Sequence, residues 1–266
     1  MSKLFENQIA IVTGGNSGIG EGVSMDLAKN GAKVMIVGRN EAKNEKVKKA
    51  IENENGYAEC YKVDVSKREE VEKAVNTIYE KHKKIDILIS NAGNSTQPKF
   101  CTDMTYEEWD VLIKTHLYGT FNFVKACGEK MKHNKYGRIV LTSSLAGIMG
   151  FTGSINYSSA KTGLVGMTYT LCKELGPYGI TVNAVQPGII RTNMTSAALS
   201  QMEEPFKKAT PVQKIGEPKD VANAVRFFCM PESSFITGVV MRVDGGYILN
   251  SQMDQLMFQM CSSQEK

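Results

Sequence analysis

Several features that would place this chain in a specialised class are missing from its sequence. Its six cysteines stand singly, with no C-x-x-C pair and no cysteine and histidine at the spacing of metal ligands. No apolar run reaches the roughly 18 residues that a membrane-spanning helix needs, and the opening residues MSKLFENQ carry no secretion signal. We therefore expect a cytoplasmic protein with reduced thiols, no bound metal and no membrane partner.

Concentrated charge is missing as well. The chain has 32 basic and 28 acidic residues, a net charge of +4, and its lysines are scattered through stretches such as NEAKNEKVKKAIENENG. Scattered lysines at helical spacing are typical of solvated helix faces rather than of a nucleic-acid-binding patch. We expect no nucleic-acid partner. A length of 266 residues with 42% hydrophobic residues is enough for one large domain or for two.

What the sequence does contain is a regular alternation of short β-branched runs and longer helical segments. Such alternation is typical of βαβ units and of a parallel sheet. The strands are expected at 8–13, 33–38, 58–63, 85–90, 137–143, 179–186 and 239–243, and the helices near 17–29, 41–54, 67–82, 105–132, 157–176 and 217–229. The pattern predicts one Rossmann-type, doubly wound α/β domain with a seven-stranded parallel sheet and helices on both faces. This domain would span residues 1–247 and include a long insertion at 188–216, and residues 248–266 would form a tail.

A glycine-rich turn, TGGNSGIG at 13–20, follows the first expected strand and opens the first expected helix. Glycines at 14, 18 and 20 would let the backbone approach a pyrophosphate, and the helix N-terminus would offer it free N–H groups. Alone, the pattern is also compatible with a simple tight turn. Its position at the end of strand one favours dinucleotide binding.

The end of the second expected strand bears on which dinucleotide is bound. The sequence there is VGRN, with Gly38 where an acidic residue would contact the ribose hydroxyls and with Arg39 next to it. Because a guanidinium can hold a phosphate through two hydrogen bonds, Arg39 favours NADP(H) over NAD(H). If Arg39 is instead a surface arginine that stacks on adenine, the choice stays open.

The segment TSSLAGIMGFTGSINYSSAK at 142–161 carries a candidate proton-transfer group. Tyr157 and Lys161 are four residues apart near the start of a helix, so their side chains share one face. Ser144, at the end of the fifth expected strand, can be brought beside them by the loop. A nearby ammonium favours the phenolate, so we expect it to lower the tyrosine pKa and suit the pair to a carbonyl/alcohol couple.

With these motifs the chain resembles a short-chain dehydrogenase/reductase of about 250 residues over almost its whole length. The matching elements are TGGNSGIG, Asp64-Val65, NAG at 91–93, Ser144 with YSSAK, NAVQPG at 183–188, GEPKDVA at 216–222 and ITG…VDGG at 236–246. The resemblance implies Tyr157 as general acid/base, Lys161 as ribose ligand, Ser144 as hydrogen-bond donor to the reacting oxygen, and a homotetramer or homodimer. It also implies a cofactor site, to which we assign Gly14, Asn16, Ser17, Gly18, Ile19, Gly20, Arg39, Asn40, Asp64, Val65, Asn91, Ala92, Gly93, Tyr157, Lys161, Pro187, Gly188, Ile189, Ile190 and Thr192.

One position departs from that family. His116, just before LYGTF, stands where most members have an asparagine that supports a water connecting the lysine to solvent. We hypothesise that a neutral imidazole, which can both donate and accept, rebuilds this proton relay, so His116 is a fourth catalytic candidate. The alternative is a core histidine satisfied by one hydrogen bond.

The expected pocket segments are apolar. They contain Met149, Phe151, Met194, Ala198, Leu199, Met202 and Phe206, and a methionine-rich stripe of Met253, Leu256, Met257 and Met260 follows in the tail. The stripe could cover a ligand or dock on the same or a neighbouring subunit. The leading interpretation is an NADP(H)-dependent oxidoreductase that interconverts a secondary alcohol and a ketone on a bulky hydrophobic substrate, above all a hydroxysteroid such as a bile acid. The alternatives are a 3-oxoacyl-carrier-protein (3-oxoacyl thioester) reductase and, more remotely, a non-catalytic dinucleotide sensor, which the intact Ser144, Tyr157 and Lys161 disfavour.

Overall fold

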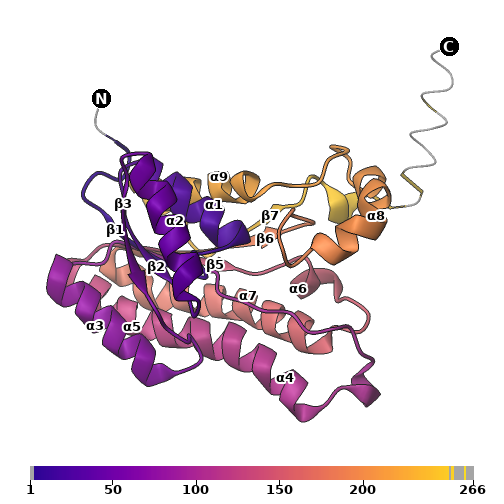
Figure 1. The fold of residues 1–266 in the computed structure, drawn as a ribbon, viewed down its shortest axis with the longest axis horizontal. Coiled ribbons are helices and arrows are strands. Elements are labelled where there is room, and N and C mark those ends of the chain that lie inside the picture. Colours follow the sequence, from indigo (N-terminus) through magenta and orange to yellow (C-terminus); the bar gives the residue numbers. More distant parts are fainter. Residues whose placement is uncertain (1–2, 252, 255–260, 262–266) are drawn as a thin grey trace.

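The sheet has seven parallel strands in the order β3-β2-β1-β4-β5-β6-β7 (Figure 1). The computed structural model describes residues 3–251, 253–254 and 261. The strands are β1 Ile9–Thr13, β2 Lys33–Val37, β3 Tyr57–Tyr61, β4 Ile87–Ser90, β5 Gly137–Thr142, β6 Ile180–Pro187 and β7 Val240–Val243. The predicted doubly wound α/β fold with seven parallel strands in one domain is confirmed.

Helices cover both faces of this sheet (Figure 1). They are α1 Gly18–Lys29, α2 Glu41–Asn53, α3 Arg68–His82, α4 Tyr106–Ile113, α5 Gly119–Asn134, α6 Ala146–Met149, α7 Ile155–Leu175, α8 Ser196–Ala209 and α9 Pro218–Cys229. One buried cluster joins α1, α2 and α9 to one face, and a second joins α3, α5 and α7 to the other. The sheet therefore packs between two apolar layers, one on each face.

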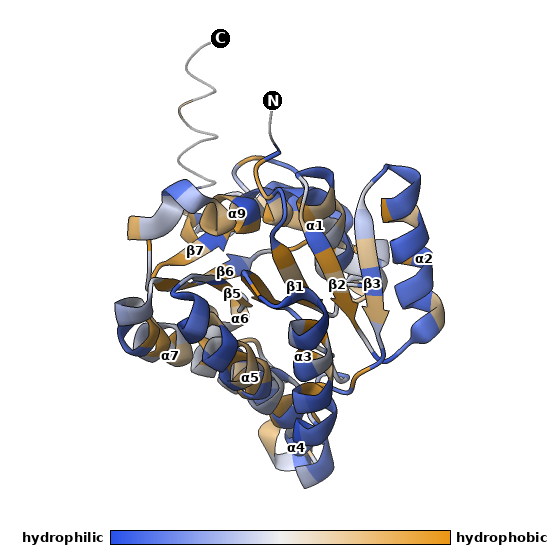
Figure 2. Ribbon diagram, turned by 90° about the vertical axis from the view of Figure 1, so that its left-hand side faces the viewer, coloured by the Kyte–Doolittle hydropathy of each residue, from blue (hydrophilic) through white to orange (hydrophobic). Residues whose placement is uncertain are grey.

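The alternation of side chains along the strands explains the two layers. In β1, Ala10 and Val12 belong to the cluster with α1 and α9, whereas Ile9 and Ile11 belong to the cluster on the opposite face. All five residues of β1 are buried, so both sets must be apolar, and Figure 2 shows the strands as apolar bands between amphipathic helices. This burial on both faces fixes the register of the central strands.

The strand order reverses direction at β1. This strand pairs with β2 on one side and with β4 on the other. The chain builds one half of the sheet with β2 and β3, and then returns to the other side of β1 to build the second half from β4 onward. At such a switch point the loops beyond the carboxyl ends diverge and leave a crevice in which ligands bind. The glycine turn after β1 and the NAG segment after β4 both open into this crevice.

The expected helix at 105–132 is interrupted in the structure. The sequence predicts one continuous helix, but α4 passes into a π-helical turn, Lys114–Tyr118, before α5 begins. At the start of α4, Thr105 and Glu108 form a capping box, in which each side chain accepts a hydrogen bond from the backbone N–H of the other residue. A π-turn accommodates one extra residue per turn, which a prediction based on helical period does not reveal, and it carries His116.

The insertion at 188–216 is not a plain loop either. It contains α8, which is kinked at Met202, where the backbone leaves helical geometry, and which includes Pro205. In the tail, Met253 is 65% exposed, while Leu256, Met257 and Met260 lie outside the described residues. No helix in the described ranges combines the length and the apolar character that crossing a bilayer demands.

Candidate active site

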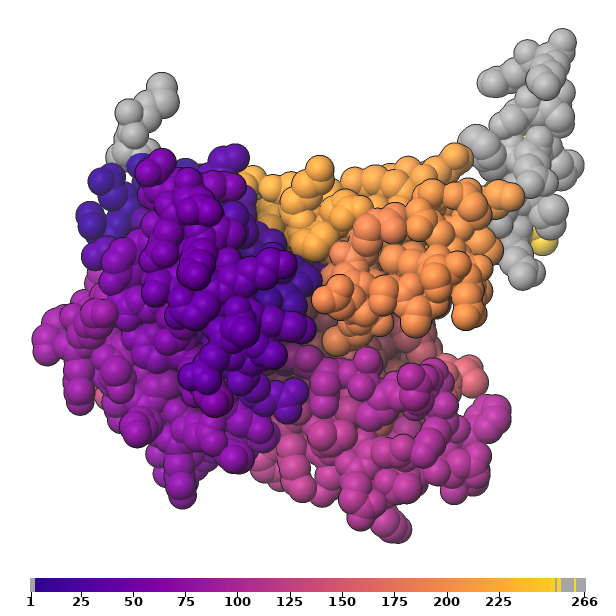
Figure 3. Space-filling model, in the orientation of Figure 1, coloured from indigo at the N-terminus to yellow at the C-terminus, as the bar shows by residue number. Residues whose placement is uncertain are grey.

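A cleft of about 350 Å³, open to solvent, lies at the carboxyl end of the sheet. Figure 3 shows its mouth as a hollow between the N-terminal part of the chain, the α8 segment and the magenta region that contains α4. Its lining comprises Gly14, Asn16, Ser17, Gly18, Ile19, Gly38, Arg39, Asn40, Lys43, Val63, Asp64, Val65, Asn91, Ala92, Gly93, Thr115, His116, Thr142, Ser143, Ser144, Tyr157, Lys161, Pro187, Gly188, Ile190, Thr192, Asn193, Met194 and Thr195.

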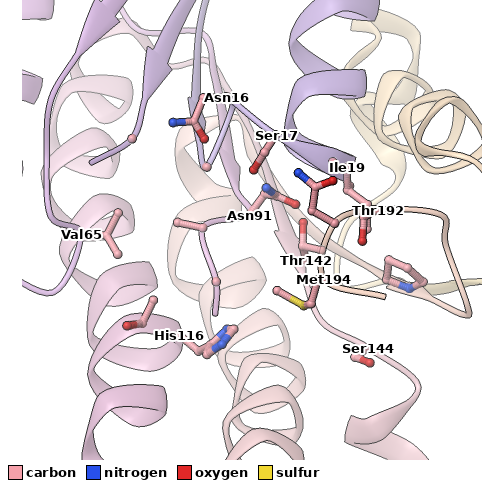
Figure 4. A pocket seen from close by; sticks show the side chains of 18 of the residues that line it. Asn16, Ser17, Ile19, Val65, Asn91, His116, Thr142, Ser144, Thr192 and Met194 are labelled. Atoms are coloured by element: carbon pink, nitrogen blue, oxygen red, sulfur yellow. The ribbon is translucent and has the colours of Figure 1, made fainter. Parts of the chain in front are cut away.

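The glycine turn forms one end of the cleft and fits a dinucleotide. Gly14 and Gly18 have φ of +64° and +54°, a backbone conformation that other residues rarely adopt. Because the turn leads directly into α1, a pyrophosphate placed there would meet free N–H groups at the helix N-terminus. Figure 4 shows Asn16, Ser17 and Ile19 at this end, opposite His116 and Ser144. The turn is fastened to the NAG segment, since Thr13 Oγ1 accepts hydrogen bonds from Asn91 N at 2.9 Å and from Ala92 N at 3.0 Å.

Cationic side chains gather where β2 ends. Arg39 is exposed and lines the cleft, and Lys43, on the first turn of α2, lines it as well. After the neighbouring strand β3, burial alone would raise the pKa of Asp64, but hydrogen bonds from Ser66 and the charge of Arg39 hold that pKa below its usual value. Asp64 thus stays ionised and paired with Ser66, and two cations are left to meet a phosphate.

The second end of the cleft brings together the predicted Ser144, Tyr157 and Lys161. Ser144 Oγ accepts a hydrogen bond from Ala146 N at 3.2 Å. Lys161 Nζ donates to Thr142 O at 2.6 Å and lies 5.5 Å from the centre of the Tyr157 ring. Strand β5 supplies Thr142 and helix α7 supplies Tyr157 and Lys161, so the site is built across two elements of the core.

The electrostatics of this cluster differ from the expectation that Lys161 would lower the tyrosine pKa. Burial raises the pKa of Tyr157 above its ordinary value, and the hydrogen bond with Ser144 opposes that rise. Burial also lowers the pKa of Lys161 to about 7, because its ammonium is removed from water without a carboxylate beside it. At neutral pH the phenol therefore keeps its proton, which suits it to donate that proton.

His116 occupies the π-turn and is nearly fully buried, with 2% of its surface exposed. Its Nε2 lies 2.9 Å from Asn94 O, and its ring stands edge-on to Tyr157 with 5.4 Å between ring centres. Burial, with the charge of Lys161, lowers the pKa of His116 to about 3, so the imidazole is neutral. Within the described structure its Nδ1 is buried without a hydrogen-bond partner. A neutral ring with one unpaired nitrogen therefore lines the site.

The comparison with known protein families agrees with this geometry. A family model described as enoyl-(acyl carrier protein) reductase matches residues 14–248. A solved structure of a short-chain type dehydrogenase/reductase from Mycobacterium ulcerans superimposes with a TM-score of 0.89 at 30% identity, covering 92% of this chain and 91% of that one. The chain belongs to the short-chain dehydrogenase/reductase family. It is therefore an oxidoreductase.

Other members of the short-chain dehydrogenase/reductase family are similar over equally long stretches. The 3-oxoacyl-(acyl-carrier-protein) reductase of Aquifex aeolicus is 37% identical over 247 residues, which are 92% of this chain and 99% of that protein. The corresponding reductase of Chlamydia muridarum is 36% identical over 247 residues, with coverage of 92% and 99%. The structure of levodione reductase has a TM-score of 0.89 at 29% identity and covers 93% of this chain and 100% of that one.

Two predicted cofactor residues of this dehydrogenase/reductase do not line the cleft. Gly20 is buried behind the glycine turn, where an added Cβ would lie 2.1 Å from Gly14 O, so it serves close packing rather than contact with a ligand. Ile189 borders a separate hollow beside β7, and its carbonyl pairs with Gly216 N. All the other predicted site residues line the cleft.

Sequence reasoning also missed several residues that line the cleft. They are Lys43, Val63, Thr115, Thr142, Ser143, Asn193 and Thr195. Lys43 had a usable signal, because it follows the helix-capping Asn40 by three residues and so sits on the first turn of α2 beside Arg39. Of the apolar residues expected around a substrate, Met194 lines the cleft, while Met149, Phe151 and Met202 are exposed. Among the described residues, no three potential metal ligands gather in one place.

Proposed function

We propose that this protein is an NADP(H)-dependent reductase that converts a ketone into a secondary alcohol, and the reverse. The observation that carries the proposal is the arrangement of the cleft. Ser144, Tyr157 and Lys161 meet at one end, and the glycine turn with Arg39 and Lys43 forms the other. A dinucleotide that spans these two ends would place its nicotinamide beside the tyrosine.

The chain's own residues would hold the cofactor in four places. The glycine turn would receive the pyrophosphate, Arg39 and Lys43 a 2′-phosphate, and Asp64 with Val65 the adenine. Lys161 would hold the nicotinamide ribose, while Pro187, Gly188, Ile190 and Thr192 would fix the nicotinamide. When bound, the cofactor supplies or accepts the hydride.

The side chains of the protein supply the proton. Ser144 and Tyr157 would both donate hydrogen bonds to the carbonyl oxygen, which polarises the bond to carbon. As the carbon receives a hydride, Tyr157 gives its phenolic proton to that oxygen, and the product is the alcohol. The ammonium of Lys161 stabilises the resulting phenolate until a proton from solvent restores the phenol. The raised pKa of Tyr157 favours this direction, because the phenol starts out protonated.

A 3-oxoacyl thioester is the substrate class best supported. Curated relatives that are 34 to 37% identical over nearly their whole length are 3-oxoacyl-(acyl-carrier-protein) reductases. The comparisons favour this class over the expected hydroxysteroid or bile acid. The hydroxysteroid remains a second candidate on one observation: the exposed apolar side chain of Met194 lines the cleft. Such a side chain would suit a large rigid hydrophobe as well as an acyl chain.

The division of the chain and its assembly are part of the proposal. Residues 1–247 would form the catalytic domain, with 188–216 as the segment that closes over substrate, and 248–266 a tail. The protein would assemble as a homotetramer through the outer faces of α4, the π-turn, α5 and α7, which expose Val111, Tyr118, Phe121 and Tyr169.

The catalytic assignment is tested with Tyr157→Phe. This change removes the acidic proton and keeps the ring, so we expect kcat to fall at least about 100-fold, while the Kd for NADPH stays nearly unchanged. Steady-state kinetics and fluorescence titration with NADPH measure the two quantities. Full activity of the variant would refute the assignment of Tyr157 as the proton donor.

The substrate is tested with a panel. Acetoacetyl thioesters and keto-steroids are each assayed with NADPH and NADH. A kcat/KM for the thioester at least about tenfold above that of every steroid supports the thioester reductase. The reverse ranking would support the hydroxysteroid dehydrogenase.

A further inference from the structure

A pair of asparagines lies at the adenosine end of the cleft, where Asn16 lines the cleft and Asn44 is buried behind it. Asn16, in the glycine turn, donates from Nδ2 to Oδ1 of Asn44 at 2.6 Å, although the two residues are 28 positions apart. Asn44 is fully buried, and its Nδ2 donates to Gly38 O at 3.0 Å and to Tyr61 O at 3.4 Å. We call Asn16 and Asn44 the amide pair. It ties the turn after β1 to the ends of β2 and β3.

The amide pair occupies the space above Gly38. A Cβ at this position would lie 2.4 Å from Asn16 Nδ2 and 2.8 Å from Asn44 Oδ1. Gly38 is not among the glycines with positive φ, so the position requires glycine because of space rather than because of backbone conformation. Any side chain here must push the Asn16 amide away. The buried Asn44 Oδ1 would then lose its hydrogen-bond partner, which is costly in the interior of a protein.

We propose that Asn44, acting through Asn16, is a positioning residue that sets the cofactor preference. An acidic side chain at position 38 would accept hydrogen bonds from the ribose hydroxyls of NAD(H) and repel a 2′-phosphate. The amide pair leaves no room for a side chain at position 38, so this position can carry no acidic group. Arg39 and Lys43 are then the charged groups that meet the 2′ position. This inference rests on the proposed preference for NADP(H). It adds that the preference for NADP(H) depends on the uncharged Asn16 and Asn44, which exclude an acidic side chain from position 38.

The inference predicts that the effect of Gly38→Asp on cofactor binding depends on the residue at position 16. If the charge at position 38 alone decided the preference, the effect would be the same with either residue at position 16. In the natural background, Gly38→Asp should weaken NADPH binding by at least about tenfold and bring no gain in NADH binding, because the new side chain breaks the amide pair. In an Asn16→Ala background, where the nearest obstructing atom, Asn16 Nδ2, is gone and only Asn44 Oδ1 must shift, Gly38→Asp should strengthen NADH binding by about tenfold.

Fluorescence titration of the four proteins with NADPH and NADH measures these affinities, and thermal melting confirms that each variant folds. Lys46→Ala, which removes an exposed charge of α2 outside the cleft, is the control for general charge effects. Asn44→Ser, combined with Gly38→Asp, repeats the test from the other member of the pair. Equal gains in NADH affinity from Gly38→Asp in both backgrounds would overturn the inference. Equal binding of NADH and NADPH by the natural protein would instead refute the proposed cofactor preference, and the coupling between positions 38 and 16 would still be read from the same titrations.

Discussion

At the residue scale, the most informative side chain is His116. It is neutral because its pKa is lowered to about 3, so it cannot relay a proton by becoming an imidazolium near neutral pH. A relay must instead use the neutral ring, in which Nε2 is paired with Asn94 and Nδ1 is open to a hydrogen bond with a water or a ligand. His116 therefore remains a candidate for the proton path through hydrogen bonding alone.

Replacing His116 by alanine tests that path. We expect His116→Ala to lower kcat about tenfold and to change its pH profile, with partial recovery when imidazole is added to the buffer. His116→Asn, which restores an amide donor and acceptor, should lose less activity. The control is His133→Ala, which removes an exposed histidine at the end of α5. If kcat and its pH profile stay unchanged in His116→Ala, the residue is a core histidine and the relay hypothesis is wrong.

The burial of Lys161 should lower the stability of the protein in the absence of cofactor. Its pKa is lowered from 10.5 to about 7 by burial. Between pH 7 and 10.5 the unfolded chain binds a proton that the native protein does not, so the free energy of unfolding rises with pH over this range. Below pH 7 the native protein carries the full cost of burying the Lys161 ammonium. We expect Lys161→Met to be more stable than the natural protein at pH 7, by about 1–2 kcal/mol, and inactive.

Chemical denaturation at pH 7 and at pH 10 measures the effect. The advantage of Lys161→Met should shrink as pH rises toward 10.5, whereas Lys46→Met, at an exposed position of α2, should show no such trend. A Lys161→Met protein less stable than its parent at both pH values would contradict the penalty.

At the scale of elements, helix α8 is held over the cleft by charged groups. Arg191 donates to both carboxylate oxygens of Glu203 at 2.9 and 3.1 Å and to Glu217 at 3.1 Å, which joins the segment after β6 to α8 and to the start of α9. Arg191 stands between Ile190 and Thr192, which line the cleft. Loosening this network should disturb ligand binding more than folding, because exposed ion pairs contribute little to stability.

We therefore expect Arg191→Gln to raise KM for cofactor and substrate about three- to tenfold while the melting temperature changes little. Arg191→Lys should recover part of the loss, since it keeps the charge but not the forked geometry. Kinetics at low and high salt, with Arg68→Gln as a control for an exposed ion pair on α3, provide the measurement. An unchanged KM in Arg191→Gln, or an equal rise in Arg68→Gln, would show that the network does not hold α8.

At the scale of the whole molecule, exposed aromatic residues gather on the outer helices. Tyr118 and Phe121 are 59% and 55% exposed near the start of α5, and Tyr169 on α7 is 49% exposed. Exposed apolar groups on adjoining helices are typical of surfaces that bind another protein chain. In the proposed homotetramer they would pack against their symmetry mates.

Sedimentation velocity tests this assembly. We expect the natural protein to sediment with about four times the 29.3 kDa mass of one chain. Phe121→Glu should produce smaller species, because a charge would be buried in the interface. Phe100→Glu, which changes an exposed phenylalanine in the segment before α4, should leave the mass unchanged. A monomeric natural protein would refute the tetramer.

Much of this molecule follows from local sequence. Alternation of apolar strands and amphipathic helices gives the order of elements, since each must bury its own face, and the glycines of the turn after β1 give the start of the site. Tyr157 and Lys161 share a face because helical spacing alone places them there. The sequence by itself therefore identifies Ser144, Tyr157, Lys161 and Arg39 as candidate site residues.

The tertiary structure decided what depends on distant neighbours. The pKa values of His116, Tyr157 and Lys161 are set by burial, and burial is created by elements far apart in the chain, so no local pattern reports it. The π-turn that carries His116 and the contact between Asn16 and Asn44 have the same origin. Sequence spacing determines which residues share a strand or a helix face. Packing determines which faces meet, and therefore how much water and charge surround each side chain.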